Sequence, residues 1–175
     1  NIKPHIVNHD ARDSVMIGGN FVSAYGGFDS YIVGREMSDK IFAPTTGRMK
    51  EEERGMDITH LDWVSWSSWI NNLSRFKYGV QLGTAAAGTF NLNCAYHGIP
   101  CIGYSNVDTQ RICHSKLTVD VGDIKSARKL AVKLKEDEDF YKECSQIAMR
   151  KYKECFDEEV YIYTMKKVIE EVIST

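Results

Sequence analysis

The chain has 175 residues, and 43% of them are apolar, which is enough for a single α/β domain with a sizeable core. Its formal net charge is only −2 and no block of like charge occurs, so a general nucleic-acid surface is excluded. No apolar run is long enough to cross a bilayer and no signal-peptide pattern opens the sequence, so we expect a cytoplasmic protein. Because the first residue is not methionine, we interpret the chain as part of a longer polypeptide.

The five cysteines do not form a recognisable metal or disulfide pattern, because no CxxC pair occurs. A zinc set can be imagined, but its spacing is irregular and Cys101 falls in a predicted buried strand. Its members would be Cys94, His97, Cys101, Cys113 and His114. We therefore expect no metal, and reduced, mostly buried thiols.

The first third of the chain predicts short strands separated by polar loops. Residues 1–14 are weakly patterned and are interpreted as a linker or an edge segment. Strands are predicted at Val15–Gly18, Ser30–Gly34 and Ile41–Ala43, and a polar loop at 44–54.

Two arginines follow the ends of predicted strands, namely Arg35 and Arg48. In an open parallel sheet, ligands bind at the carboxyl ends of the strands. Both arginines are therefore candidate anion contacts. Each could equally be a solvated surface arginine.

The next stretch, Leu61–Phe76, has the apolar spacing of an amphipathic helix, with Asp62 placed to favour its first turn. The apolar positions include two tryptophans, which could serve as a sugar platform. Helical spacing favours core packing against the sheet instead. These positions are Trp63, Trp66, Ile70, Leu73 and Phe76.

The central stretch has the order of a parallel crossover unit: strand, glycine-containing loop, helix and strand. We predict a strand at Tyr78–Leu82, a small-residue loop at Gly83–Gly88 and a helix at Thr89–His97. Two further strands follow at Ile99–Tyr104 and Leu117–Val121.

The small-residue loop before this helix predicts a phosphate site. Residues 84–89 leave backbone N–H groups unpaired at the positive end of a helix dipole, with little side-chain bulk in front of them. The alternative is that small residues here only permit close packing of the helix on the sheet. From the residues alone, the two interpretations are equally good.

The last third predicts three helices. Asp123 is placed to cap a helix at Ile124–Lys135. Apolar residues at helical spacing then mark a second helix from Phe140 to Tyr152 and a third from Tyr161 to Ile173.

The stretch from Gly88 to Asp123 resembles part of a known protein family. The run GTFNLNCAYHGIPCIG at 88–103, followed by VDTQ and TVDVGD, resembles the donor-binding half of a GT-B glycosyltransferase. The resemblance implies that a nucleotide diphosphate lies on the helix N-terminus at Gly88 and Thr89, and that Asn93 holds the ribose. Gly98 and Pro100 match the pattern that ends the helix.

The same resemblance implies roles for other positions. Asp108 and Gln110 fall in a loop that meets the donor sugar in some branches of the family. Tyr31–Gly34 resembles the strand before the nucleobase pocket, and Ile41–Gly47 resembles the next strand and its base-contacting loop. Arg35 or Arg48 would add positive charge near the phosphates or the base.

The sequence also departs from the family. The retaining branch carries two glutamates around this helix, and the equivalent positions here are Ala85 and Asn93. The Asn93 amide can still hydrogen-bond a ribose hydroxyl, but Ala85 supplies no carboxylate. Either the mechanism does not use that glutamate, or the domain binds a nucleotide without catalysis.

The resemblance thus predicts an α/β fold, a Rossmann-like open parallel sheet flanked by helices, equivalent to the C-terminal half of a GT-B glycosyltransferase. The implied function is transfer of a sugar from a nucleotide-sugar donor to an unknown acceptor, without a bound metal or other cofactor. No catalytic base can be named. A sugar-nucleotide epimerase of the same fold and a non-catalytic nucleotide-binding or assembly module remain alternatives.

The resemblance also predicts how the chain is divided. Residues 15–156 would form the nucleotide-sugar-binding domain, and 157–175 a C-terminal helix that packs on a missing N-terminal domain of the same polypeptide. Without that domain, we expect the apolar surface of this helix to be exposed or to be buried in a homodimer.

Overall fold

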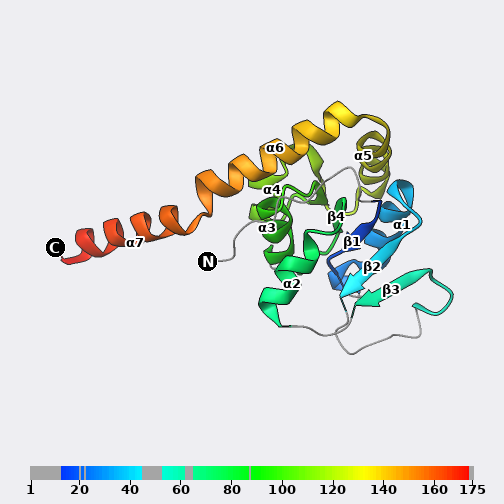
Figure 1. The fold of residues 1–175 in the computed structure, drawn as a ribbon, viewed down its shortest axis with the longest axis horizontal. Coiled ribbons are helices and arrows are strands. Elements are labelled where there is room, and N and C mark those ends of the chain that lie inside the picture. Colours follow the sequence, from blue (N-terminus) through cyan, green and yellow to red (C-terminus); the bar gives the residue numbers. More distant parts are fainter. Residues whose placement is uncertain are drawn as a thin grey trace.

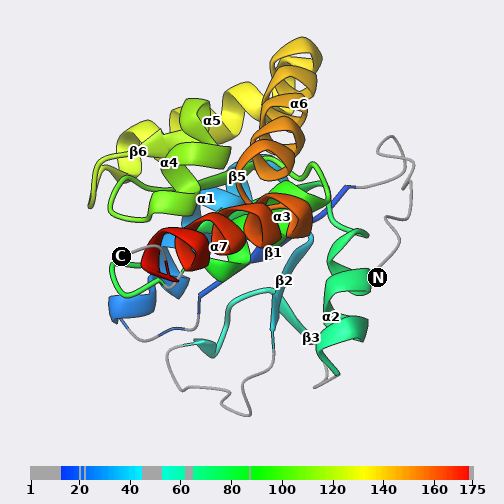
Figure 2. The same cartoon turned by 90° about the vertical axis from the view of Figure 1, so that its left-hand side faces the viewer.

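A single six-stranded parallel sheet organises the protein in our computed structural model, which describes residues 13–19, 21, 23–44, 53–61, 65–86 and 88–173. Its strand order is β3-β2-β1-β4-β5-β6, and Figure 2 shows the strands running from β3 at the lower edge to β6 at the upper edge. The strands are β1 Val15–Ile17, β2 Ile41–Pro44, β3 Ile58–Leu61, β4 Tyr78–Gln81, β5 Cys101–Tyr104 and β6 Thr118–Val119. This confirms the prediction of a Rossmann-like open parallel sheet.

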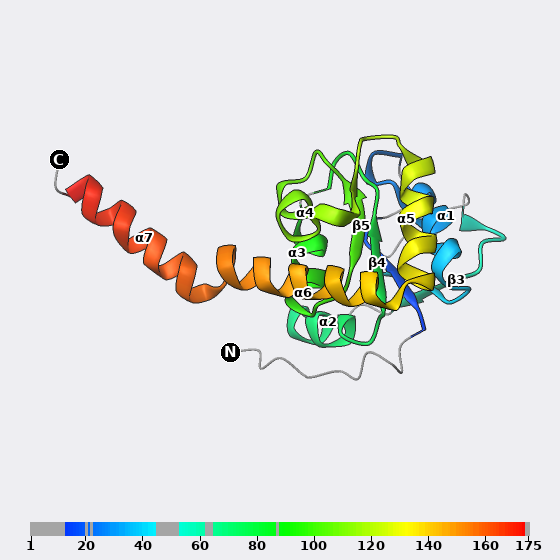
Figure 3. The same ribbon diagram turned by 90° about the horizontal axis from the view of Figure 1, so that it is seen from above.

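Helices cover both faces of the sheet, as Figures 1 and 3 show. They are α1 Gly27–Met37, α2 Trp66–Leu73, α3 Thr89–Tyr96, α4 Asp108–Cys113, α5 Ile124–Glu136, α6 Glu138–Cys155 and α7 Glu158–Ile173. Helices α1 and α5 pack on one face, and α2 and α3 pack on the other. Helices α4 and α6 pack against the outer side of α3.

The central strand β1 shows why the sheet is parallel and buried. Val15 and Ile17 point into the core under α1, whereas Met16 points into the core under α3. All three are fully buried, which requires a continuous apolar run rather than an alternating one. Val15 pairs with Ile41 on one side and with Tyr78 on the other.

Side-chain caps fix where three of the helices begin. Asp123 accepts a hydrogen bond from the Ser126 backbone N–H at 2.9 Å, which confirms the predicted cap of α5. Asp137 and Ser65 cap α6 and α2 in the same way. The predicted cap Asp62 lies outside the described residues.

The predicted strand at Ser30–Gly34 is wrong, because these residues belong to α1. The run is apolar and β-branched at its centre, which favours a strand locally. Its buried residues are instead Ser30, Val33 and Met37, at helical spacing. Tyr31–Gly34 is therefore not the strand before a nucleobase pocket.

The predicted helix at Leu61–Phe76 is partly wrong, since Leu61 closes β3 and the helix α2 begins at Trp66. Strand β3 was missed because its sequence, ITHL, is short and lies at the edge of the sheet, with no fully buried residue. Ile70 and Leu73 are buried as predicted, but Trp66 is 59% exposed. Trp63 lies outside the described residues.

Helix α7 extends away from the sheet and its covering helices, and among the described elements it packs mainly against α6 (Figures 1 and 3). None of its described residues is buried. The predicted third C-terminal helix is therefore confirmed as a helix, and its apolar side chains face outward. No helix that the structure describes is both long and apolar enough to cross a membrane.

Candidate functional site

The strand order creates one place where a ligand crevice is expected. Strands β1 and β4 lie side by side at the centre of the sheet, and the chain leaves them in opposite directions, through β2 to β3 and through β5 to β6. Ligands of open α/β sheets bind at the carboxyl ends of the two strands where the order reverses. That edge carries the loops that follow Ile17 and Gln81.

These two loops pack against each other through their backbones. The Ala85 N–H donates to the Ala24 carbonyl at 2.9 Å, and a Cβ atom on Gly26 would lie 1.7 Å from the Leu82 carbonyl oxygen. Only glycine therefore fits at position 26, where φ is +63°. Neither loop sequence, 18–26 or 82–88, contains a charged residue.

Helix α3 starts at the same edge, directly after the loop that follows β4. Its N-cap is Gly88, which has a φ of 78° and makes no side-chain cap hydrogen bond. Thr109 Oγ1 donates to the Gly88 carbonyl at 2.9 Å and holds the turn in place. Thr89, the first helical residue, is exposed. Gly88 itself is buried against Val107 and Thr109, so the positive end of the helix dipole reaches solvent at Thr89.

The predicted ribose position lies on the same helix. Asn93 is half-buried and stands four residues after Thr89, so the two side chains share one face of α3. Ala85 is exposed in the loop before the helix. The roles of these residues stay predictions.

Asp108 lies close to this helix start, although not in a loop. It is the first residue of α4, a short helix that we did not predict, and its exposed carboxylate pairs with Arg111. The loop before α4 contacts the loop after β4, because Asn106 Nδ2 donates to the Thr84 carbonyl at 3.0 Å. Asp108 is therefore placed beside the phosphate-binding loop candidate.

Gln110, in contrast, cannot reach a ligand in this structure. It is completely buried, and its amide nitrogen donates to the carbonyls of Cys101 at 2.9 Å and Leu117 at 3.1 Å. Its amide oxygen accepts from Asn91 Nδ2 at 2.6 Å. The predicted contact with the donor sugar is wrong, because Gln110 lies inside the core where it joins α4 to β5.

His114 completes this buried polar network, which sequence reasoning missed. Its Nδ1 accepts from the Cys101 N–H at 3.4 Å, so its Nε2 carries the proton and donates to the Asn91 carbonyl at 2.9 Å. Burial lowers the pKa of His114 to about 4. No local sequence signal marks this network, because Gln110 lies among the polar residues Asp108, Thr109 and Arg111. The network fixes α3 to β5 and α4.

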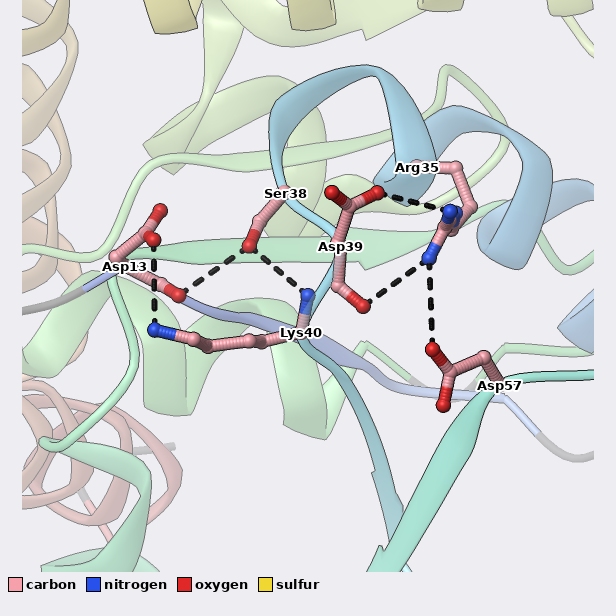
Figure 4. Close-up of polar contacts among 6 residues, drawn as sticks. All are labelled: Asp13, Arg35, Ser38, Asp39, Lys40 and Asp57. Carbon is pink, nitrogen blue, oxygen red and sulfur yellow. Dashed lines mark hydrogen bonds and ion pairs between the residues drawn. The ribbon is translucent and has the colours of Figure 1, made fainter.

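Arg35 lies at the opposite end of the strands, where β2 and β3 begin (Figure 4). It stands in the last turn of α1, which runs back from the carboxyl ends of the strands, and it pairs with Asp39 at 2.8 Å. Its second partner is Asp57, just before β3, at 4.0 Å. The prediction of an anion contact at the carboxyl edge is therefore wrong for Arg35. Arg48 lies outside the described residues.

The cysteine and histidine residues that could suggest zinc are separated by packing. Cys94 and Cys101 belong to the core between α3 and the sheet, whereas Cys113 packs between α3 and α6. Within the described ranges, no group of three or more His, Cys, Asp or Glu side chains is placed to hold a metal ion. Four of the five thiols are buried and free, and Cys155 is exposed.

The fold is that of the C-terminal half of GT-B glycosyltransferases. One similar structure is the sucrose-phosphate synthase of Thermosynechococcus elongatus, with a TM-score of 0.72 and 14% identity over 96% of this chain and 47% of that one. Anabaena HepE in complex with UDP-glucose has a TM-score of 0.70 and 10% identity, over 95% of this chain and 50% of that chain.

An isolated domain is also similar. The C-terminal domain of the group 1 glycosyl transferase LpcC from Francisella tularensis has a TM-score of 0.66 and 11% identity, over 83% of this chain and 86% of that one. The chain thus spans about half of each of the first two structures and most of the LpcC domain. No family model and no curated protein sequence matches the chain.

Proposed function

We propose that this chain is the donor-binding domain of a glycosyltransferase, which transfers a sugar from a nucleotide-sugar donor to an acceptor. One observation carries the proposal: helix α3 begins at Gly88, without a side-chain cap, at the carboxyl edge where β1 and β4 meet. In open α/β sheets this edge is where nucleotides bind, with phosphates on a helix N-terminus.

In the proposed mechanism, the backbone amides at Gly88 and Thr89 stabilise the diphosphate as it leaves the sugar. Asn93 hydrogen-bonds the ribose hydroxyls from the next turn of α3, and Asp108 accepts from hydroxyls of the donor sugar. Arg48, placed by the family resemblance, adds positive charge near the phosphates. Ala85 supplies no carboxylate, and no catalytic base can be named in this chain.

The nucleotide is the first thing to test. UDP is the natural first probe, because the structurally similar HepE binds UDP-glucose and UDP. A nucleoside diphosphate that binds only the folded chain raises its melting temperature by mass action, so a thermal-shift panel of UDP, GDP, ADP and CDP identifies the base. If none of these nucleotides raises the melting temperature, the proposal is wrong.

A charge variant at the helix start locates the site. Thr89→Asp places a carboxylate in the first turn of α3, where it favours the helix but repels a diphosphate. We expect the folded variant to lose at least tenfold in nucleotide affinity, measured by calorimetry. Thr89→Asn is the matched control, with nearly the same shape and no charge, and it should bind within about threefold of the wild type. If Thr89→Asp and Thr89→Asn bind the nucleotide equally well, the phosphates do not lie at the start of α3.

A non-catalytic nucleotide-binding module is the second candidate, and two observations favour it. Position 85 carries no acid, and the loops 18–26 and 82–88 contain no charged group that could help a leaving diphosphate. Both candidates predict nucleotide binding, so only turnover separates them. Sugar transfer or donor hydrolysis by the polypeptide with its first domain supports the enzyme, and its absence there supports the module.

A further inference from the structure

A cavity of about 300 Å³ lies between helix α2 and the sheet. Three of its lining side chains are aromatic, namely Phe42 of β2, Trp69 of α2 and Phe76, and Leu61 of β3 adds to the apolar lining. Ligand pockets are concave, mostly apolar and about 300–1,000 Å³ in volume. The cavity is also about twice as large as an apolar cavity of about 150 Å³ that binds benzene. It therefore has room for a small molecule of one or two rings.

The packing of the core holds these rings in place. The ring centroids of Phe42 and Phe76 are 5.1 Å apart, and their planes are tilted by 58°. Phe76 is buried in the same apolar cluster as Leu73 and Met16, on which Phe42 and Trp69 also pack. Aromatic rings attract a further ring through their faces and edges. The cavity is thus preformed for a planar apolar group.

Two polar side chains from the C-terminal end of α2 reach the same cavity. They are Asn72, which is half-buried, and Arg75, which is exposed. Within the part of the chain that the structure describes, neither side chain has a hydrogen bond or an ion pair. An arginine here could merely favour the negative end of the helix dipole. The guanidinium of Arg75, however, donates to none of the α2 carbonyls, so its donors are available to a ligand in the cavity.

We propose that this cavity, the α2 pocket, binds a small aromatic carboxylate. Its rings lie among Phe42, Trp69 and Phe76, and its carboxylate lies on Arg75 and Asn72. A guanidinium binds a carboxylate through two parallel N–H···O bonds, and an asparagine amide can donate a third. A neutral sugar fits less well, because it would leave the positive charge without a counter-charge.

The α2 pocket is separate from the candidate nucleotide site. Helix α2 lies beside β2 and β3 (Figure 2). Ser14, which also lines the pocket, lies just before β1, and Arg75 lies just before β4. The polar side of the pocket is therefore at the amino ends of the central strands, whereas α3 begins at their carboxyl ends. This inference does not depend on nucleotide binding.

The first test is calorimetry of the 175-residue chain with 2-naphthoate, a two-ring carboxylate. We expect a dissociation constant of about 1 mM or lower, as is typical for a ligand of this size. Two analogues should bind at least about tenfold more weakly: 2-naphthalenemethanol, which has the rings without the charge, and octanoate, which has the charge without the rings. No binding of 2-naphthoate, or equal binding of either analogue, overturns the proposal.

A charge variant then locates the carboxylate. Arg75→Gln should weaken binding of 2-naphthoate at least about tenfold and leave that of 2-naphthalenemethanol unchanged. Because the Arg75 side chain is exposed and unpaired within the described part of the chain, the melting temperature of this variant should equal that of the wild type. Arg150→Gln is the matched control, since it removes an exposed arginine of α6 that pairs with Glu154 outside the pocket. If both variants bind 2-naphthoate equally well, the acid does not bind in the α2 pocket.

A ring variant tests the apolar part of the pocket. Trp69→Ala removes one aromatic side chain from the lining and should weaken binding of 2-naphthoate at least about tenfold. Trp66→Ala is its matched control, because Trp66 is 59% exposed and does not line the pocket. Equal affinities for these two variants would contradict the proposed position of the rings.

A last measurement separates this proposal from other occupants and from the proposed function. If the polypeptide with its first domain does not bind 2-naphthoate, whereas the 175-residue chain does, another part of the protein fills the pocket and the proposal is overturned. UDP should not compete with 2-naphthoate, and UDP affinity should be equal in the wild type and in Arg75→Gln. Failure of nucleotide binding therefore leaves the α2 pocket untouched, and failure of 2-naphthoate binding leaves the α3 site untouched.

Discussion

His114 is a neutral group held inside the protein, and this makes folding stability depend on pH. Its Nδ1 accepts the Cys101 N–H, so a proton added there both charges a buried ring and opposes a donor. Because its folded pKa is about 4, below the ordinary histidine value of 6.5, the unfolded chain binds the proton first as the pH falls. We expect the stability from His114 to be fully present at pH 7 and to be lost between pH 6.5 and 4.

The expected loss is about 3 kcal/mol, at 1.36 kcal/mol for each pKa unit. Urea unfolding at pH 7 and at pH 4.5 measures most of it. His114→Gln provides the control, because it keeps an amide in the network but cannot titrate: it should be less stable at pH 7 and lose correspondingly less stability on acidification. An equal pH dependence for variant and wild type would assign the acid sensitivity to other groups.

Asn93 tests the ribose assignment at the level of one side chain. If its amide holds the ribose, Asn93→Ala should weaken nucleotide binding by about 1–3 kcal/mol, the typical cost of removing one partner of a buried hydrogen bond. Calorimetry with the best nucleoside diphosphate measures this. In the wild type, the dideoxyribonucleotide should bind more weakly than the ribonucleotide by a similar amount. Equal affinities for the two nucleotides would show that nothing here contacts the ribose hydroxyls.

At the scale of the element, the start of α3 depends on a glycine for two separable reasons. Gly88 has a positive φ, and a Cβ atom there would lie 2.4 Å from Thr109 Oγ1. Gly122 has a similar φ of 85° but open space around its Cβ position. We expect Gly122→Ala to cost about 1–2 kcal/mol of unfolding free energy, from its backbone conformation alone. Gly88→Ala should cost clearly more, and the difference between the two in chemical denaturation measures the close contact.

The elements that could be predicted are those whose local signal agrees with their tertiary role. Helix α5 was predicted from an aspartate cap and a regular apolar spacing, and β4 from a buried apolar run between glycines. Helix α1 was mistaken for a strand because its central residues favour β structure locally. These residues form a helix because the residues buried against the sheet recur at helical spacing, and this packing outweighs the local preference. Strand β3 forms because it pairs with β2, and its four-residue sequence alone does not predict that pairing.

The same distinction explains what could be predicted of the candidate site. Gly88 and Thr89 were predicted from a local pattern, a small-residue loop before a helix, and the structure places that loop at the switch point of the sheet, while their role in binding stays a prediction. Arg35 and Gln110 were misplaced because their positions depend on secondary structure that was assigned wrongly, a strand for α1 and a loop for α4. The Asn91–Gln110–His114 network links residues distant in sequence, and it requires the fold to be known.

For the molecule as a whole, the candidate site is open on one side. Its described residues, Gly88, Thr89, Asn93 and Asp108, all come from the segments after β4 and β5, at the carboxyl ends of the strands. This chain covers only about half of the similar sucrose-phosphate synthase and HepE chains. A sugar donor bound here would therefore have one wall of protein beside it, and the acceptor side would be supplied by other residues.

We therefore predict that the 175-residue chain binds its nucleotide-sugar donor but neither hydrolyses it nor transfers the sugar. Catalysis needs the acceptor held in line with the sugar and a base within reach, and effective molarities of about 10⁵ M or more are lost when one reactant is free. The measurement follows release of the nucleoside diphosphate from the donor, with Thr89→Asp as a control for contaminating activity. Turnover by the wild type that Thr89→Asp abolishes would show that this one domain carries a complete catalytic site, and that the base must be sought among its own residues, beginning with Asp108.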